Sequence, residues 1–417
     1  MEKELRHCKG DDSNMKGDLS DRTFWMAKED EIKQGKTTDV YFLYTRDILR
    51  RVNKNPPVII EVFARSVEGN WGVVTGIYEV AKLLEGMNVN VKAMEEGEIF
   101  LSARNLQIYE PVVQIEANYA DIAIYENPVL GFLCFSSGVS SKAARIRLAA
   151  GDKHVFSFGT RRAHPAIAPT IERAAYIAGF DDVSNMLGAE LMGIKPVGTM
   201  PHALILTFND QREAWKAFHD FIPKDVPRIA LADTLSDEKT ESIMALELLG
   251  EKLDGVRLDT ISSMSGNRRK IIEEVRRELD IRNGKHVKIY ASGGLDEEEI
   301  AQLRDIVDGF GIGTSVSSAK AVDFSFKIVE FIEDGKRIRR AKRGDIAGRK
   351  QVYRNESFHD LVAINDSKAP SGYRPLLTDL IVNGKMVRQF KRASEIRSRT
   401  VENLKKFAAA EPTLKWV

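Results

Sequence analysis

The sequence predicts an α/β protein in which an N-terminal α+β, sandwich-like domain is followed by an irregular or incomplete (β/α) barrel. Two observations lead to this prediction. The order of strands and helices changes near residue 150, and two glycine-rich strand ends stand one βα unit apart late in the second series. These strand ends are Ser292-Gly293-Gly294 and Gly311-Ile312-Gly313-Thr314. Strands that alternate regularly with helices are typical of a parallel sheet.

The first domain, residues 23–150, follows a polar arm at residues 1–22. Apolar periodicity predicts strands at 58–63, 89–94 and 112–116, an amphipathic helix at 73–84, and apolar helices up to residue 150. This mixed order indicates an α+β domain rather than a strict βαβ series. The arm has no apolar core segment, and the chain has no apolar run of about 18 residues, so we expect neither export nor membrane insertion.

Residues 151–325 form the predicted barrel domain, in which short apolar runs alternate with amphipathic helices. Strands are expected at 155–158, 228–231, 255–258, 288–291 and 307–311. Helices are expected at 163–177, 236–249, 268–279 and 296–305. These elements make five or six βα units, too few for a closed barrel. Residues 326–417 begin with a basic stretch, and we expect this segment to pack back on the N-terminal domain.

Composition limits the possible partners. The 417 residues are 43% hydrophobic, which is enough for a full core. With 62 basic and 61 acidic residues the net charge is +1, so we expect a small-molecule substrate rather than nucleic acid or a membrane surface. The only cysteines, Cys8 and Cys134, lie far apart in the sequence, which argues against a disulfide framework and a structural zinc site. A cytoplasmic location fits this cysteine content.

Charged side chains follow the predicted barrel strands, whose carboxyl ends meet in one mouth. Arg161 and Arg162 follow the first strand, Asp233 follows the second, and Arg257 and Asp259 end the third. Arginine suits a phosphate or a carboxylate, and the two aspartates suit a Mg²⁺ ion that bridges phosphate oxygens. Either aspartate could instead cap the helix that follows it. Arg257 alternates with apolar neighbours, so its side chain requires a buried anionic partner.

The two glycine clusters are candidates for a phosphate site, because small residues let backbone N–H groups approach an anion closely. The last two βα loops of barrels often form such a site. The same glycines could instead only make tight turns. Two of the seven histidines, His164 and His202, lie near the proposed strand ends, and each could be a helix-start residue without chemistry.

Several segments, in order along the chain, closely resemble nicotinate phosphoribosyltransferase, particularly its archaeal-type branch. The resemblance spans roughly residues 35 to 330. It rests on Thr37-Thr38-Asp39-Val40-Tyr41-Phe42, Phe158-Gly159-Thr160-Arg161-Arg162-Ala163-His164-Pro165, Gly179-Phe180-Asp181 with Ser184-Asn185, Gly198-Thr199-Met200-Pro201-His202-Ala203, and Val256-Arg257-Leu258-Asp259. Some archaeal-type relatives carry a cysteine-rich zinc knuckle, which two distant cysteines cannot supply.

The resemblance implies the type II phosphoribosyltransferase fold and a head-to-tail homodimer with composite active sites. A larger homo-oligomer is the alternative assembly. The reaction would join nicotinate to phosphoribosyl pyrophosphate in NAD biosynthesis and salvage, with Mg²⁺ as cofactor and ATP as co-substrate. Asp233, Asp259 and Arg257 would act on the pyrophosphate. The 5′-phosphate would be held by the glycine clusters, that is by Ser292, Gly293, Gly294, Gly311, Gly313 and Thr314.

The same resemblance implies that the pyridine ring lies between Phe158 of one subunit and Tyr41 of the partner subunit. Arg161 or Arg162 would pair with the carboxylate of the nicotinate. Asp181 or Ser184 would face the ring, and Ser184 is favoured because an aspartate would repel a carboxylate substrate. His202 matches the histidine that the family phosphorylates with ATP. The alternatives are a nicotinamide or quinolinate phosphoribosyltransferase, another sugar-phosphate barrel enzyme, and a non-catalytic nucleotide-binding protein.

Overall fold

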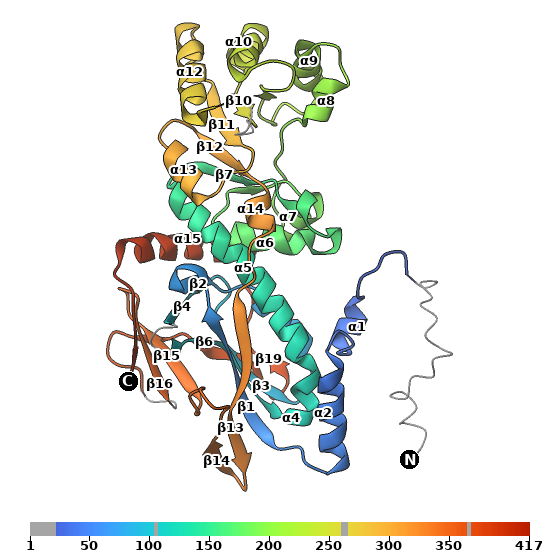
Figure 1. The fold of residues 1–417 in the computed structure, drawn as a ribbon, viewed down its shortest axis with the longest axis vertical. Helices are drawn as coiled ribbons and strands as arrows, with labels where there is room; N and C mark the ends of the chain where they lie inside the picture. Colours follow the sequence, from blue (N-terminus) through green and yellow to red (C-terminus); the bar gives the residue numbers. More distant parts are fainter. Residues whose placement is uncertain (1–21, 104–106, 260–265, 365–367) are drawn as a thin grey trace.

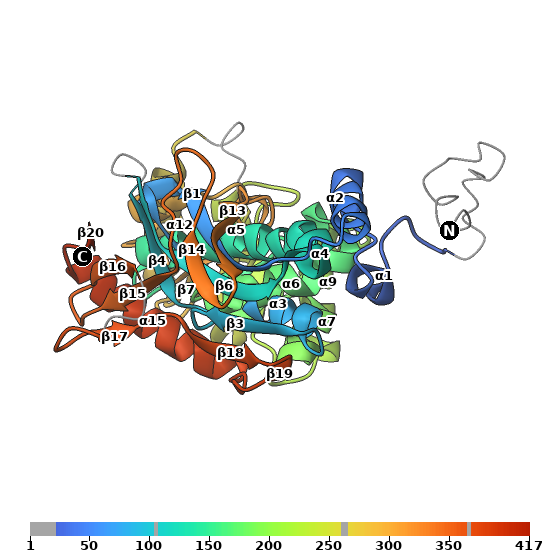
Figure 2. The same cartoon turned by 90° about the horizontal axis from the view of Figure 1, so that it is seen from below.

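The computed structural model describes residues 22–103, 107–259, 266–364 and 368–417. All but the last residue of the predicted arm at 1–22 therefore lies outside the described residues, as does Cys8. Figure 1 shows the parallel sheet of the barrel at one end of the molecule and the strands of the N-terminal domain at the other. Helices α1 (Glu29–Lys33) and α2 (Val40–Arg51) stand to one side of the N-terminal domain in both views (Figures 1 and 2).

The N-terminal domain is built on a seven-stranded antiparallel sheet in the order β14-β13-β1-β6-β3-β18-β19. The strands are β1 (Pro57–Ser66), β3 (Val89–Ala93), β6 (Pro111–Asn118), β13 (Asp323–Glu333), β14 (Lys336–Arg339), β18 (Thr378–Val382) and β19 (Lys385–Met386). The strands predicted at 58–63, 89–94 and 112–116 are present. Four strands of this sheet come from beyond residue 322, so the chain returns to its first domain after the barrel.

A smaller sheet of β2 (Trp71–Val73), β4 (Ile99–Ala103) and β5 (Ile108–Tyr109) lies beside this large sheet. The helix predicted at 73–84 is wrong at its start, because Trp71–Val73 pairs with β4 and α3 covers only Ile77–Leu84. Gly76 begins the helix at φ +95°, where a side chain would be strained. An added Cβ would also lie 2.6 Å from the Phe132 carbonyl oxygen, so glycine is required there.

Helix α5 (Glu126–Ala150) runs from the N-terminal domain to the barrel, and follows α4 (Tyr119–Ile122) (Figure 1). The continuous stretch Tyr119–Ala150 is long and apolar enough to cross a membrane by length and composition, and its most apolar 18-residue window has a mean hydropathy of 1.3. However, 56% of its most apolar window is buried inside the protein. Val129, Leu133 and Val139 pack into the two hydrophobic cores, so the apolar character reflects a core helix.

The barrel is an open six-stranded parallel sheet in the order β8-β7-β12-β11-β10-β9, which confirms the prediction of an incomplete barrel. Its strands are β7 (His154–Ser157), β8 (Asp182–Val183), β9 (Ile229–Leu231), β10 (Gly255–Leu258), β11 (Lys288–Ser292) and β12 (Gly309–Ile312). The sheet stays open between β8 and β9. The chain there forms α7 (Met186–Met192), α8 (His202–Leu206) and α9 (Gln211–Phe221).

The remaining barrel helices are α6 (Ala168–Ile177), α10 (Glu238–Leu249), α12 (Arg268–Ile281), α13 (Glu297–Leu303) and α14 (Thr314–Ser317). The helix predicted at 163–177 begins later than expected. Short 3₁₀ turns occupy Thr160–Arg162 and Pro165–Ile167, and the α-helix starts at Ala168. The reason is Pro165, which disfavours helical geometry at the preceding residue, and His164 is accordingly extended.

The C-terminal segment holds much more regular structure than the sequence indicated. Strand β13 spans the predicted boundary at 325, and a four-stranded sheet follows in the order β17-β15-β16-β20. Its strands are β15 (Lys350–Arg354), β16 (His359–Ile364), β17 (Arg374–Pro375) and β20 (Thr413–Trp416). Helix α15 (Ala393–Ala409) reaches the barrel, where Arg397 Nε donates to the Phe180 carbonyl oxygen at 2.7 Å. The segment therefore contacts both domains.

A buried ionic cluster around Arg354 attaches the C-terminal sheet to the N-terminal domain. Arg354 is 2% exposed and donates to both carboxylate oxygens of Asp360 and, at 2.9 Å, to Glu98. Its guanidinium also lies 3.8 Å from a Glu110 oxygen. Burial, and then the charge of Asp360, raise the pKa of Glu110 well above its usual range. One arginine therefore balances several buried carboxyl groups.

Replacing Arg354 by Met should lower the free energy of unfolding by ~3–5 kcal/mol, because it leaves buried carboxylates without their cation. Chemical denaturation of the purified chain measures this change. The matched control is Arg277→Met on α12, where the side chain is 68% exposed and lies 3.4 Å from Glu278. An exposed ion pair contributes about 0–1 kcal/mol, so equal losses in the two variants would contradict the role given to Arg354.

Candidate active site at the barrel mouth

The carboxyl ends of the parallel strands bring together side chains that are far apart in the sequence. Phe158 follows β7, Asp233 follows β9 by two residues, Asp259 follows β10, and Ser292 ends β11. Because the strands are parallel and adjacent, these ends lie at one edge of the sheet. His202, the first residue of α8, joins them from the segment that occupies the opening of the barrel.

His202 is held between two aspartates. Its Nε2 lies 3.2 Å from Asp259 Oδ2, and its Nδ1 lies 3.8 Å from Asp233 Oδ1. The Thr234 hydroxyl lies 3.1 Å from Nδ1, and the side chain is 40% exposed. The hydrogen bond to Asp259 is the main cause that raises the pKa of His202, although partial burial opposes it. His202 is thus an accessible imidazole whose orientation is fixed through both ring nitrogens.

Asp259 contacts the other members of this cluster. Its Oδ1 accepts a hydrogen bond of 2.6 Å from the Ser292 hydroxyl, and its Oδ2 lies 3.7 Å from the Arg257 guanidinium. Burial acts to raise the pKa of Asp259, but the hydrogen bonds from His202 and Ser292 hold it below its ordinary value. Asp259 is therefore ionised at neutral pH, and its side chain is engaged by His202 and Ser292.

Asp233 lies deeper, with 8% of its side chain exposed. Its Oδ2 accepts the Asp259 backbone N–H at 2.6 Å, whereas its buried Oδ1 has no hydrogen-bond partner. Burial raises the pKa of Asp233 to about 6. An unpartnered carboxylate oxygen fits a cation that also binds substrate phosphates, as Mg²⁺ commonly does. Within the described ranges, no three His, Cys, Asp or Glu side chains form a metal site by themselves.

Arg257 points into the mouth, and its side chain is 15% exposed. Its guanidinium donates to Thr199 Oγ1 at 2.7 Å and lies 5.5 Å from the centroid of the Phe158 ring. Burial lowers the pKa of Arg257, and the nearby Asp259 and Asp233 charges oppose this change. The anionic partner that its position on β10 requires is therefore Asp259.

The glycine clusters serve two different structural purposes. Gly311 lies inside β12, and an added Cβ would lie 2.5 Å from a carbon of the Phe158 ring, so this glycine makes room for the ring. Gly293 and Gly294 have φ values of +90° and +71°, and the Cβ position of Gly294 is open. Gly313 precedes Thr314, the exposed first residue of α14. Ser315 joins the two loops by donating to the Leu295 carbonyl oxygen at 2.8 Å.

The expected ring pocket is next to these groups. Arg161 and Arg162 are exposed in a 3₁₀ turn just beyond Phe158, and the charge of Arg161 acts on Arg257. Ser184 follows β8, level with Phe158 in the register of β7 and β8. Asp181 is used elsewhere, because it pairs with Arg397 and, at 2.9 Å, with Arg147.

Two predicted residues are not part of this cluster. His164 accepts a hydrogen bond from the Ala166 backbone N–H at 3.2 Å and caps its own 3₁₀ turn. Tyr41 lies on α2 at the N-terminal domain, is 55% exposed, and donates to Asp39 at 3.1 Å (Figure 1). Conversely, the sequence analysis assigned no role to Thr199, which lies within the motif that contains His202, or to Thr234, which follows Asp233.

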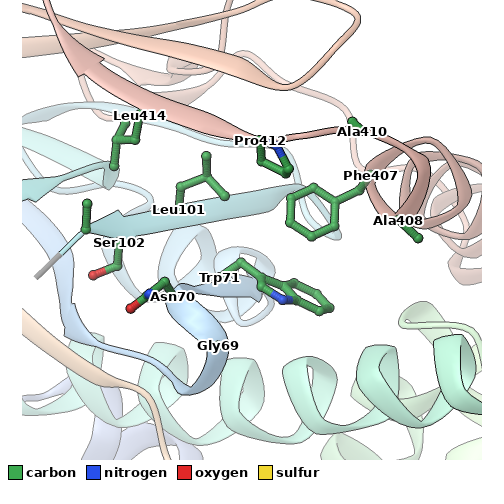
Figure 3. Close-up of a pocket in the computed structure, with 11 residues that line it drawn as sticks. Gly69, Asn70, Trp71, Leu101, Ser102, Phe407, Ala408, Ala410, Pro412 and Leu414 are labelled. Atoms are coloured by element: carbon green, nitrogen blue, oxygen red, sulfur yellow. The ribbon is translucent and has the colours of Figure 1, made fainter.

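A separate hollow of about 480 Å³ lies away from the barrel mouth (Figure 3). The Phe407 ring on α15 and the Trp71 indole on β2 form its floor, with ring centroids 4.9 Å apart. Leu101 and Leu414 also line it, and none of its lining residues is charged. This hollow therefore does not suit a phosphate group.

Comparisons with known proteins agree with the fold. Residues 39–137 and 139–327 match the family models of the N-terminal and C-terminal domains of quinolinate phosphoribosyl transferase. A nicotinate phosphoribosyltransferase of Mycobacterium tuberculosis is 33% identical over 309 residues, which cover 70% of this chain and 65% of that protein. One from Bacillus subtilis is 30% identical, covering 69% and 61%. The match thus spans less than two thirds of these relatives' length.

Solved structures extend the similarity to nearly the whole chain. The crystal structure of a nicotinate-nucleotide pyrophosphorylase from Pyrococcus furiosus is 54% identical, with a TM-score of 0.88, and the match covers 93% of this chain and 99% of that chain. Human nicotinic acid phosphoribosyltransferase shares the fold at 19% identity, with a TM-score of 0.73 and coverage of 91% and 97%. The chain therefore belongs to the type II phosphoribosyltransferase family.

Proposed function

We propose that this protein is a nicotinate phosphoribosyltransferase, which joins nicotinate to phosphoribosyl pyrophosphate and releases nicotinate mononucleotide and pyrophosphate in NAD biosynthesis. The observation that carries this proposal is the cluster at the mouth, where Arg257 lies over Phe158 while Asp259 binds both His202 and Ser292. It offers an aromatic surface for a base beside charged groups for a pyrophosphate.

Breaking the anomeric C–O bond leaves positive charge on the sugar and negative charge on the departing pyrophosphate. Arg257 lies where it can bind the pyrophosphate, and Asp259 lies where it can face the cationic sugar. Asp233 and Asp259 would hold the Mg²⁺ ion, which neutralises phosphate charge when bound. Since Asp259 already binds Arg257, His202 and Ser292, the catalytic groups are oriented before the substrate arrives.

The base would stack on the Phe158 ring, whose position Gly311 makes possible. Arg161 and Arg162 have no ion pair among the described residues, so either guanidinium is available for the carboxylate of the base. Ser184 would face the ring, because Asp181 is occupied by two arginines. The 5′-phosphate would bind the backbone N–H groups around Gly293, Gly294, Gly313 and Thr314. Ser292 would contribute to the same loop while its hydroxyl donates to Asp259.

We also propose a homodimer in which Tyr41 of the partner subunit covers the other face of the pyridine ring. Helix α2 and the residue that ends it present an exposed apolar row that a second subunit could cover, formed by Tyr41, Tyr44, Ile48 and the C-cap residue Val52. A larger homo-oligomer would be built from the same homodimer. A cytoplasmic location stays a prediction.

His202 is the proposed acceptor of the ATP γ-phosphoryl group. An imidazole nitrogen would attack the γ-phosphorus, the bond to the β-phosphate oxygen would break, and ADP would leave. Asp259 orients the ring through Nε2. A phosphoryl dianion beside Asp233 and Asp259 would change the affinity for phosphoribosyl pyrophosphate, which is what coupling to ATP hydrolysis requires.

Quinolinate and nicotinamide phosphoribosyltransferase are the alternative activities. The family models carry the quinolinate name, and two exposed arginines could bind the two carboxylates of that base. Nicotinate should nevertheless be the preferred base, because a guanidinium pairs bidentately with a carboxylate but not with an amide.

Mononucleotide formation should be assayed with nicotinate, nicotinamide and quinolinate in parallel. We expect turnover with nicotinate to be at least about tenfold faster than with nicotinamide, in line with the loss of one charge-assisted pair. Release of carbon dioxide with quinolinate as the best base would favour the quinolinate activity instead. Comparable rates with nicotinamide would contradict the role of Arg161 and Arg162.

Asp259→Asn and Arg257→Ala should each lower kcat by ~10²-fold or more, because both side chains act on charge that develops in the transition state. Thermal unfolding of the same preparations gives the control for folding. If activity fell only in proportion to the folded fraction, both residues would be structural.

ATP labelled at the γ-phosphate should transfer acid-labile, base-stable phosphate to His202. The pKa of His202 is raised, so the neutral imidazole that can attack phosphorus increases with pH, and labelling should reach half its maximal rate above pH 6.5. His202→Ala should abolish the label and leave slow synthesis without ATP. His164→Ala is the matched control and should keep the label; the opposite pattern would move the acceptor to His164.

A further inference from the structure

Glu172 on α6 is a buried carboxyl group that the proposed chemistry does not use. Its side chain is 0% exposed, and neither carboxyl oxygen reaches hydrogen-bonding geometry with a partner. The hydroxyl of Ser157 is also buried and lacks a hydrogen-bond partner. Buried polar groups without partners are costly, so two of them close together require an explanation.

Glu172 lies behind both walls of the base pocket. Ser157, the last residue of β7, directly precedes Phe158 and is close enough to influence the Glu172 carboxyl group. The Asn185 backbone, which follows Ser184, influences it from the other side. The Glu172 stem packs on α7, where a Cβ at Gly188 would lie 3.0 Å from the Glu172 Cβ. One side chain therefore contacts the supports of the ring platform and of the facing serine.

The surroundings of Glu172 contain no compensating charge. Burial raises the pKa of Glu172 to about 7, and the nearby Ser157 and Asn185 groups only partly oppose this rise. No charged side chain in the described part of the chain adds to these influences. Arg147 on α5 and Arg397 on α15, two helices that pack on α6, pair with Asp181. Arg173, the next residue on α6, pairs with Glu96 at 2.8 Å.

We propose that Glu172 is a positioning residue that joins the two walls of the base pocket, and that an anionic pyridine binds tightly only while this carboxyl group is uncharged. The proposal rests on the proposed function, since it takes the pocket beside Phe158 and Ser184 as the base site. A neutral carboxyl group can both donate and accept a hydrogen bond, so it can satisfy Ser157 and the Asn185 backbone together.

The ionised form has the opposite effect. It can only accept, and it places an unpaired negative charge behind a pocket that must receive a carboxylate. Like charges repel more strongly in the poorly solvated interior than in water. Affinity for nicotinate should therefore fall as the pH rises through neutrality, whereas affinity for the uncharged isostere nicotinamide should not.

The test is equilibrium binding of nicotinate and of nicotinamide to the purified full-length protein by calorimetry, between pH 6 and pH 9. For the wild-type chain we expect the Kd of nicotinate to rise by up to about tenfold for each pH unit above 7, as one proton per site requires. Glu172→Gln keeps the shape and removes this ionisation, so most of the rise in its nicotinate Kd above pH 7 should disappear, and what remains belongs to His202 and Asp233. Glu190→Gln, at an exposed position on α7, should behave like the wild type.

A second variant keeps the test decisive if Glu172→Gln does not fold. Ser157→Ala removes a group that lowers the pKa of Glu172, so the pH at which nicotinate affinity falls should move upward. The proposal is overturned if Glu172→Gln retains the wild-type pH profile, or if Ser157→Ala leaves the profile in place. Binding can be measured without turnover, so the two proposals fail separately. If the expected pH profile of nicotinate binding is seen but no nucleotide is formed, the proposed function alone is contradicted. If nucleotide is formed but Glu172→Gln keeps the wild-type pH profile, this inference alone is contradicted.

Discussion

The pairing of β13 with β1 is the constraint on which the rest of the structure depends. Strand β13 follows the barrel, yet it pairs antiparallel with β1 from Val58↔Phe331 to Ser66↔Asp323. The barrel is therefore inserted between strands of one sheet, and α5 carries the chain into it. Gly138 on α5 allows the returning chain to cross closely, since an added Cβ would lie 2.5 Å from the Lys320 carbonyl oxygen. Helix α5, which leads into the barrel, and strand β13, which leads out of it, therefore both attach the barrel to the N-terminal domain.

The barrel mouth is organised around the charge of Asp259. Asp259 and Asp233 balance Arg257 and His202 within the site, while Ser292 supplies a neutral donor. Because these charges partly offset one another, and only Asp233 Oδ1 among the oxygens of the two aspartates lacks a hydrogen-bond partner in the part of the molecule that the structure describes, the proposed binding of substrate anions would also use groups outside this cluster. Arg161 and Arg162 and the backbone of the glycine loops are such groups. The mouth thus combines a rigid catalytic cluster with exposed binding groups, which is the division that phosphoribosyl transfer would need.

The fold was predictable from the sequence where apolar side chains are buried and polar side chains are exposed. The strands at 58–63, 89–94 and 112–116 and five of the parallel barrel strands are apolar runs that become buried, and the shortfall in βα units correctly indicated an open barrel. The short strand β8 was not predicted, because two residues carry no periodic pattern. The sheet of β15, β16, β17 and β20 was not predicted. Its strands include the charged residues Lys350 and Arg354, which are buried because the distant carboxylates of Glu61 and Glu98 pair with them. Asp360 is buried beside them because Arg354 pairs with it. Such pairing leaves no local signal.

The candidate site, like the fold, was predictable from the sequence only in part. The sequence by itself determined that Asp233, Arg257, Asp259 and the glycine clusters follow parallel strands, and hence that they meet at one mouth, because strand direction sets where such residues lie. Similarity to a known family added His202. Only the tertiary structure decided that Gly311 makes room for Phe158, that Asp181 is engaged by Arg147 and Arg397, and that Glu172 is buried without a hydrogen-bond partner. Each of these depends on packing between segments distant in the sequence, and residue spacing carries no record of which segments meet.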